Sequence, residues 1–150
     1  MTRAEIITNL GKYFKIEELV CDHIYQWFVD TSWMFLDTAY LHTLLVIRRD
    51  IIGKPMTSNV PAEGTHQRGL RCNMCPLVRD KRRPYLSAHV LGKAGDFVIN
   101  GMSAEEARCL IIKNAAKLPY PIRIERNVTW LHFDVLPQYG SNEKIYQFTA

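Results

Sequence analysis

The clearest pattern along the chain is an apolar stripe between Asp37 and Ile52. Large apolar side chains recur there every three or four residues, which places them on one face of an α-helix. Gly53 follows directly, and glycine is typical of the position that ends a helix. We therefore predict a core helix over residues 37–52. The residues that recur at this spacing are Tyr40, Leu41, Leu44, Leu45, Ile47, Arg48 and Ile51, and all but Arg48 are apolar or aromatic.

A second helix is predicted over residues 103–117. Ser103 and Glu106 have the spacing of a capping box, in which each side chain bonds the backbone N–H of the other residue. Prolines follow shortly after Lys117 and cannot continue the helix. A shorter helix is expected over residues 3–13.

Short apolar or alternating runs predict the strands of a sheet. The predicted strands are 54–60, 97–99, 122–125 and 128–135, the last two joined by a tight turn at Arg126 and Asn127. Residues 61–86 are expected to form a long loop, and the polar and aromatic segment after Pro137 is expected to cover a sheet edge. These elements predict one α+β domain over residues 1–150. In it, a small antiparallel sheet has the two long helices packed on one face.

The composition is that of an ordinary globular domain, with 47% hydrophobic and 23% charged residues. A net charge of +4 would suit an anionic polymer such as a cell wall or a nucleic acid, but it is too small to select between them. No apolar run is long enough to span a bilayer, and no secretory signal is visible at the N-terminus. We therefore expect a protein that is made in the cytoplasm and that something else releases if it acts outside.

His89 and Asp96 stand at the two ends of a segment that has two glycines and an alanine between them. Small residues let the backbone turn sharply, so an imidazole and a carboxylate can reach one ion. His132 lies inside the alternating run 128–135. Two histidines and one carboxylate are the three-ligand set of a catalytic zinc, whose fourth position is left to water. We predict that these three residues bind Zn²⁺ on the free face of the sheet.

Period-two alternation places Trp130, His132 and Asp134 on one face of the last strand. In an antiparallel hairpin, Glu125 on the preceding strand comes close to His132. A carboxylate in that position can take a proton from zinc-bound water and return it to a leaving amine. Glu125 is therefore the predicted general base, and Asp134 is the alternative.

The four cysteines leave two possibilities open. Cys72 and Cys75 form a CxxC pair, which supplies only half of the ligands of a structural zinc site. Cys21 and His23, or Cys109, could complete the set. Otherwise the thiols are free, packed side chains.

The segment from Ser87 to Asp96 matches the pattern SxHxxGxAxD at every fixed position. In this it resembles the M15 family of zinc D-alanyl-D-alanine carboxypeptidases and L-alanyl-D-glutamate endopeptidases, whose fold is related to the hedgehog signalling domain. Residues 130–132 are similar to the W-x-H segment of the family. The stretch from Phe14 to Cys21 is similar to the opening of its short, single-domain bacterial and phage branch.

The resemblance implies that the three predicted ligands hold zinc and that Glu125 is the general base. Residues 69–71 are similar to a Gly-Tyr-Arg element of the family, so Arg71 is implied to hold the substrate or the developing oxyanion. Some members carry the base three residues before the last histidine, where this chain has Thr129. The hedgehog-like branch carries it about six residues before, one fewer than here. No family element matches the CxxC pair or the basic run Arg79–Arg83.

The sequence therefore predicts a zinc metallopeptidase that hydrolyses peptidoglycan stem peptides, as an endolysin or another wall-processing enzyme of phage or bacterial origin. It would act at the cell wall or in the periplasm as a monomer, with a peptide substrate and with neither nucleic acid nor a membrane span. Carboxypeptidase and endopeptidase action both stay open. The main alternative is a non-catalytic, zinc-stabilised hedgehog-like binding module. Nucleic-acid binding through Arg79–Arg83 is a weaker third hypothesis, because only Tyr85 accompanies the basic run.

Overall fold

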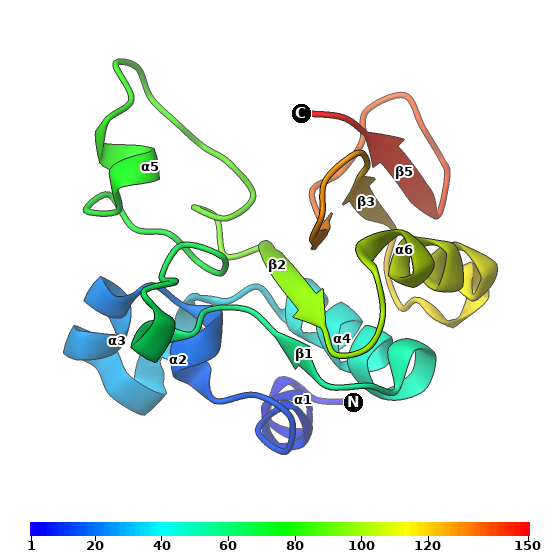
Figure 1. Cartoon of the computed structure of the whole chain (residues 1–150), viewed down its shortest axis with the longest axis horizontal. Coiled ribbons are helices and arrows are strands. Elements are labelled where there is room, and N and C mark those ends of the chain that lie inside the picture. Colours follow the sequence, from blue (N-terminus) through cyan, green and yellow to red (C-terminus); the bar gives the residue numbers. More distant parts are fainter.

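The computed structural model describes all of residues 1–150, which form an α+β fold with one five-stranded sheet (Figure 1). The α-helices are α1 (Arg3–Leu10), α2 (Ile16–Leu19), α3 (Asp22–Phe28), α4 (Thr38–Val46), α5 (Pro76–Arg79) and α6 (Ala104–Lys113). The 3₁₀ and π segments are η1 (Val29–Phe35), η2 (Ile47–Ile52), η3 (Pro61–Glu63) and η4 (Ala115–Lys117). The strands are β1 (Met56–Thr57), β2 (Ala94–Ile99), β3 (Ile122–Glu125), β4 (Leu131–Asp134) and β5 (Ile145–Phe148).

The sheet is mixed, so the prediction of a purely antiparallel sheet was wrong. Its order is β1-β2-β4-β3-β5, and every neighbouring pair is antiparallel except β3 and β5. β5 comes from the segment after Pro137 that was expected only to cover an edge. The chain reverses once into β4 and again after it, so β5 runs in the direction of β3 and pairs with its free edge in parallel.

The predicted helix over residues 37–52 is confirmed in position. Asp37 caps it, because its Oδ1 accepts hydrogen bonds from the backbone N–H groups of Ala39 and Tyr40. Its last six residues, η2, are π-helical and not α-helical. Gly53 ends the helix with a φ of 68°, a left-handed conformation that glycine adopts without steric cost.

The predicted capping box is present at the start of α6, where Ser103 and Glu106 bond each other's backbone. Arg108 of this helix is buried and donates hydrogen bonds to the backbone carbonyls of Glu125, Val128 and Trp130. These bonds hold the connection between β3 and β4. The connection spans residues 126–130, so the predicted two-residue turn was wrong.

Two predicted strands have different bounds in the structure. Only Met56–Thr57 of the predicted strand 54–60 pairs with the sheet. The strand predicted over residues 97–99 begins at Ala94, which brings Asp96 onto β2. The segment from His89 to Asp96, predicted to bind a metal, therefore ends inside the sheet and not in a loop.

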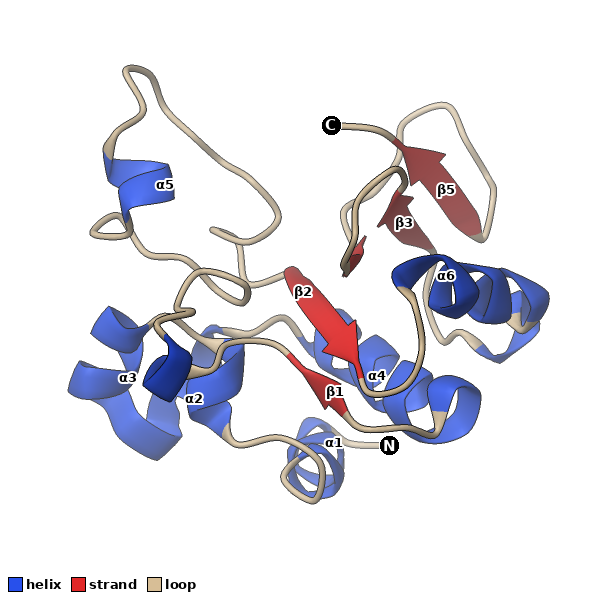
Figure 2. Ribbon diagram, in the orientation of Figure 1, coloured by secondary structure: helices blue, strands red, loops and turns tan.

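One cluster of 26 buried apolar side chains joins the helices to one face of the sheet. Tyr40 of α4 packs against Phe133 of β4, and the Phe133 ring stacks on Phe97 of β2 with centroids 5.7 Å apart. Because side chains alternate along a strand, the residues next to Phe97 in β2 and next to Phe133 in β4 point to the opposite face. Figure 2 shows α1 below β1, α4 beside β1, and the loop-rich segment with α5 rising away from these elements. No helix has both the length and the apolar composition needed to cross a membrane.

Candidate metal centre and active-site cavity

An aspartate, a histidine and a glutamate lie in one row across the sheet. Asp96 of β2 is the register partner of His132 of β4. β3 pairs with β4 so that Ile124 lies opposite Phe133, and the next pair in that register is Glu125 and His132. Directly opposed side chains have Cβ atoms about 4.5–5.5 Å apart. Strand register alone therefore brings the three functional groups together.

His89 reaches this row from the turn that precedes β2. The turn is compact, because the N–H of Gly92 donates to the carbonyl of His89 and the N–H of Lys93 donates to that of Ala88. Gly92 has a φ of 67°. A side chain at this position would also collide with the carbonyl oxygen of Phe35. Both the conformation and the lack of space therefore require a glycine here.

Each histidine has one ring nitrogen engaged by the surrounding protein and the other directed at Asp96. Nδ1 of His89 lies 2.8 Å from the carbonyl oxygen of Gly69, and Nε2 lies 3.5 Å from Asp96 Oδ1. Nε2 of His132 lies 3.3 Å from Asp134 Oδ2, and Nδ1 lies 2.7 Å from Asp96 Oδ1. Outward hydrogen bonds of this kind fix the tautomer and the orientation of metal-binding imidazoles.

His89, Asp96 and His132, here called the sheet cluster, could hold a metal ion, because their ligand atoms lie within 4.8 Å of one another. The donor set fits such an ion. At 3.5 Å, the His89 Nε2 to Asp96 distance is too long for a good hydrogen bond, so the inward nitrogen of His89 has no close partner in the protein. The structure thus brings together all three residues that the sequence predicted as ligands.

The charges around His132 favour its protonated form. Burial lowers the pKa of His132, but hydrogen bonds to Asp134 and Asp96 outweigh burial and raise that pKa to about 9. Burial likewise opposes ionisation of Asp96, but its hydrogen bond with His132 and the neighbouring ring of His89 lower the pKa of this carboxyl. A cation bound between these groups would replace the imidazolium proton, so metal binding would release protons.

Asp134 is fully buried and its oxygens are already engaged. Arg123 donates to both oxygens, from Nε at 2.8 Å and from Nη2 at 2.9 Å, and the N–H of Leu136 donates to Oδ1. Burial raises the pKa of Asp134, whereas its bonds with His132 and Arg123 lower it further than burial raises it. These contacts favour a role in orienting His132 over the alternative role of general base.

Glu125 has a different environment, because its carboxylate makes no hydrogen bond or ion pair with the protein, whereas its backbone carbonyl accepts a hydrogen bond from Arg108. The side chain lines a cavity of about 460 Å³ that also contains the sheet cluster and Arg71. A carboxylate that is free of partners and beside a candidate metal centre is able to accept a proton.

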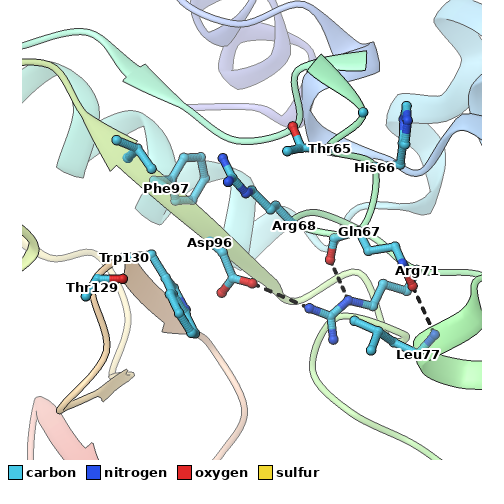
Figure 3. A pocket seen from close by; sticks show the side chains of 12 residues that line it. Thr65, His66, Gln67, Arg68, Arg71, Leu77, Asp96, Phe97, Thr129 and Trp130 are labelled. Atoms are coloured by element: carbon cyan, nitrogen blue, oxygen red, sulfur yellow. Dashed lines mark hydrogen bonds and ion pairs between the residues drawn. The ribbon is translucent and has the colours of Figure 1, made fainter. Parts of the chain in front are cut away.

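Arg71 lines this cavity and also a second one of about 420 Å³, whose lining Figure 3 shows. Its Nε donates to the carbonyl of Gln67 at 2.6 Å, and Nη2 lies 3.4 Å from Asp96 Oδ2. Arg71, Asp96 and Trp130 line both cavities, and Arg68 lines the second. The two cavities therefore adjoin at the Arg71–Asp96 pair, and together they are here called the active-site groove.

A second group of residues could hold a metal ion and is here called the cysteine cluster. Its members are Cys21, His23, Cys72 and Cys75, whose ligand atoms also lie within 4.8 Å of one another. Cys109 is exposed on α6 and does not belong to it. Of the completions that the sequence left open for the CxxC pair, the structure selects Cys21 with His23.

Sequence reasoning missed two residues that support the site. Arg123 shares a strand face with Glu125 and is the register partner of Asp134, so the alternation that identified Glu125 could have identified it too. Gln67 holds Arg71 through a backbone carbonyl, which leaves no signal in a sequence.

Comparisons of the chain with family models, with curated proteins and with solved structures gave no match.

Proposed function

We propose that this protein is a zinc-dependent peptidase that hydrolyses peptidoglycan stem peptides at the cell wall. The observation that carries the proposal is one cavity lined by a two-histidine, one-carboxylate donor set and by an unpaired glutamate. These four residues are the ligands and the base that the resemblance to the M15 family implies. On the same resemblance, the sheet with one polar face and helices behind it would be a hedgehog-like and D,D-peptidase-like fold.

Zinc suits the donor set of the sheet cluster. Magnesium and calcium prefer sites made wholly of oxygen ligands, whereas two imidazoles, one carboxylate and an open fourth position are typical of catalytic zinc. When bound there, zinc would supply a Lewis acid that polarises the scissile carbonyl and lowers the pKa of a coordinated water molecule.

Glu125 would carry the proton in this reaction. Its carboxylate takes a proton from the attacking water and then gives it to the nitrogen of the leaving amine, so Glu125 returns to its starting state. Meanwhile Asp134, held by Arg123, keeps the Nδ1 atom of His132 directed into the site. The two carboxylates thus have separate tasks, which their different partners support.

Arg71 would stabilise negative charge on the substrate. Its Nε and Nη2 have protein partners, and Nη1 has none, so Nη1 is available to an oxyanion or a carboxylate. Cavities on both sides of Arg71 leave room for substrate residues on both sides of a scissile bond. This favours an endopeptidase over a carboxypeptidase, and Arg68 in the second cavity favours an acidic substrate residue there.

The test is metal content and peptide release from purified peptidoglycan, measured for the wild type, His89→Ala and Glu125→Gln. We expect His89→Ala to lose the zinc of the sheet cluster. Glu125→Gln should keep that zinc and lose about 10²- to 10⁴-fold in hydrolysis. Glu143→Gln, which alters an exposed glutamate outside the cavity, is the matched control.

Zinc that depends on His89, together with no hydrolysis of any wall peptide by the wild type, would overturn the peptidase. That outcome would support the non-catalytic zinc module instead.

A further inference from the structure

The cysteine cluster brings together two distant parts of the chain. Cys21 and His23 lie at the start of α3, and Cys72 and Cys75 lie in the loop before α5. The backbones beside them pair directly, because Leu70 N–H donates to Leu19 O and Cys21 N–H donates to Leu70 O, both at 2.9 Å. The four side chains therefore converge on one point from two segments that are already joined.

The spacing of the ligand atoms matches tetrahedral zinc. The Sγ atoms of Cys72 and Cys75 are 3.9 Å apart, and they lie 3.6 and 3.8 Å from His23 Nδ1. With zinc–sulfur bonds of about 2.3 Å and zinc–nitrogen bonds of about 2.0–2.1 Å, a tetrahedron separates two sulfurs by about 3.8 Å and a sulfur from a nitrogen by about 3.6 Å. A disulfide requires about 2.05 Å.

The loop geometry also suits a bound thiolate. The backbone N–H of Met74 points at Cys72 Sγ from 3.4 Å, and the N–H of Cys75 donates to the carbonyl of Cys72. A backbone donor aimed at a ligating sulfur orients it and spreads its negative charge. Cys21 and Cys75 are buried, so the cluster is shielded from solvent on the side of the core.

We propose that Cys21, His23, Cys72 and Cys75 bind a second zinc ion, which is structural and holds Arg71 in the active-site groove. Three thiolates and one imidazole fill a tetrahedral zinc, so no position is left for water or substrate. The ion therefore differs in task from the one proposed for the sheet cluster.

Arg71 is coupled to the cysteine cluster by adjacency and by hydrogen bonds. It immediately precedes Cys72, and its N–H donates to the carbonyl of His89, which ties this segment to the turn of the sheet cluster. Gln67 accepts from Arg71 Nε through its carbonyl and from the N–H of Leu77 through Oε1 (Figure 3). The second ion would bind Cys72, the residue next to Arg71. It would therefore anchor the segment that carries Arg71. This positioning role rests on the proposed function.

The first test is the zinc content of the full chain and of single variants, after dialysis against metal-free buffer. We expect two zinc ions per chain in the wild type and in Cys109→Ser, the matched control with an exposed thiol outside the cluster. Cys75→Ser and His89→Ala should each retain one. One zinc per wild-type chain that survives in Cys75→Ser would overturn the second site.

Cobalt substitution separates the two sites without an assay of hydrolysis. Thiolate ligands give Co²⁺ an intense near-ultraviolet absorption that imidazole and carboxylate ligands do not. We expect this absorption in the cobalt-loaded wild type and in His89→Ala, and we expect Cys75→Ser to lose it. Its absence from the wild type, or a Cys72–Cys75 disulfide there, would overturn the site even if Cys75→Ser does not fold.

The positioning of Arg71 is tested by a double-variant cycle on peptide hydrolysis. Cys75→Ser should lower hydrolysis by about 10- to 100-fold while the zinc of the sheet cluster stays bound. Adding it to Arg71→Ala should cost nothing more, because the residue that it positions is already absent. If the double variant instead lost the product of the two single fold-losses in hydrolysis, the positioning role would be overturned. No hydrolysis by the wild type would overturn the proposed function, and metal content and cobalt absorption would still decide the second site.

Discussion

The sheet cluster and the cysteine cluster differ in what holds their ligands in place. In the sheet cluster, Asp96 and His132 are fixed by strand register, and each histidine is oriented by an oxygen of Gly69 or Asp134. In the cysteine cluster, the only strand-like pairing nearby is the single parallel bridge between Val20 and Leu70. The sheet cluster is therefore held by the surrounding sheet, whereas on our proposal the cysteine cluster would be held in part by its ion.

The two clusters also differ in what surrounds them. The sheet cluster opens into a cavity of about 460 Å³, whereas the cysteine cluster has four side chains that could fill all positions of a tetrahedral ion. A preorganised and open site suits a reaction, because substrate can approach ligands that do not have to move. A closed site that an ion completes suits stabilisation. The comparison teaches that the surroundings of the ligands, and not only their type, separate the two proposed tasks.

Metal removal should give the largest difference between the clusters. A chelator should lower the unfolding free energy of the wild type and of His89→Ala by several kcal/mol, because the cysteine cluster then loses the ion that joins α3 to the loop before α5. The chelator should lower the unfolding free energy of Cys75→Ser by less, because this variant lacks the ion of the cysteine cluster from the start. Urea unfolding with and without chelator checks this. Equal losses in Cys75→Ser and the wild type would contradict the contrast.

Gly92→Ala should damage the sheet cluster and spare the cysteine cluster. The new Cβ would meet the carbonyl of Phe35 at a φ of 67°, so the turn that carries His89 must shift. We expect a loss of more than about 2 kcal/mol in unfolding free energy and loss of the His89-dependent metal. The cobalt–thiolate absorption should persist.

Gly140→Ala is the control for this change. Gly140 has a φ of 77° but nothing within 4 Å of its added Cβ, so only the backbone conformation is tested. We expect a cost of about 1 kcal/mol there. If Gly92→Ala and Gly140→Ala lowered the unfolding free energy by the same small amount, the contact with Phe35 would contribute nothing to the stability.

Asp134→Asn should weaken metal binding in the sheet cluster by about 10- to 100-fold, because it changes the group that orients Nε2 of His132. Competition with a chromogenic chelator measures this affinity. If Asp134 were the general base instead, the substitution would abolish hydrolysis at saturating zinc, whereas we expect saturating zinc to restore most of it.

Asp37→Ala should have the smallest effect, about 1 kcal/mol at pH 7, because it removes the cap of α4 and the bond from Lys93 Nζ at the end of the His89 turn. Burial raises the pKa of Asp37, but bonds from Lys93 and from the N–H groups of Tyr40 and Ala39 bring it below its usual value. The contribution is therefore complete above the unfolded pKa of about 3.9 and is lost as the pH falls through the lower, folded pKa. Unfolding curves of both proteins from pH 7 to pH 3 check this, and a difference that grew on acidification would contradict it.

Several features could be predicted because their causes are local. The apolar stripe of residues 37–52, its glycine stop and the capping box of Ser103 and Glu106 depend on residues within a few positions of one another. Alternation along β4 and β3 likewise placed His132 and Glu125 on one face. The same local rules missed β5, because a parallel edge strand depends on the free edge of β3 and not on its own short sequence.

The sequence by itself determined the three longest α-helices, the polar face of the sheet and the identity of the three residues in the sheet cluster. Only the tertiary structure decided that Asp134 is engaged by Arg123 while Glu125 is free, and that Cys21 and His23, not Cys109, meet the CxxC pair. The physical reason is range. Periodicity and capping act over one or two turns of chain, whereas hydrogen-bond partners and ligand sets are chosen by distances in space between residues that lie tens of positions apart.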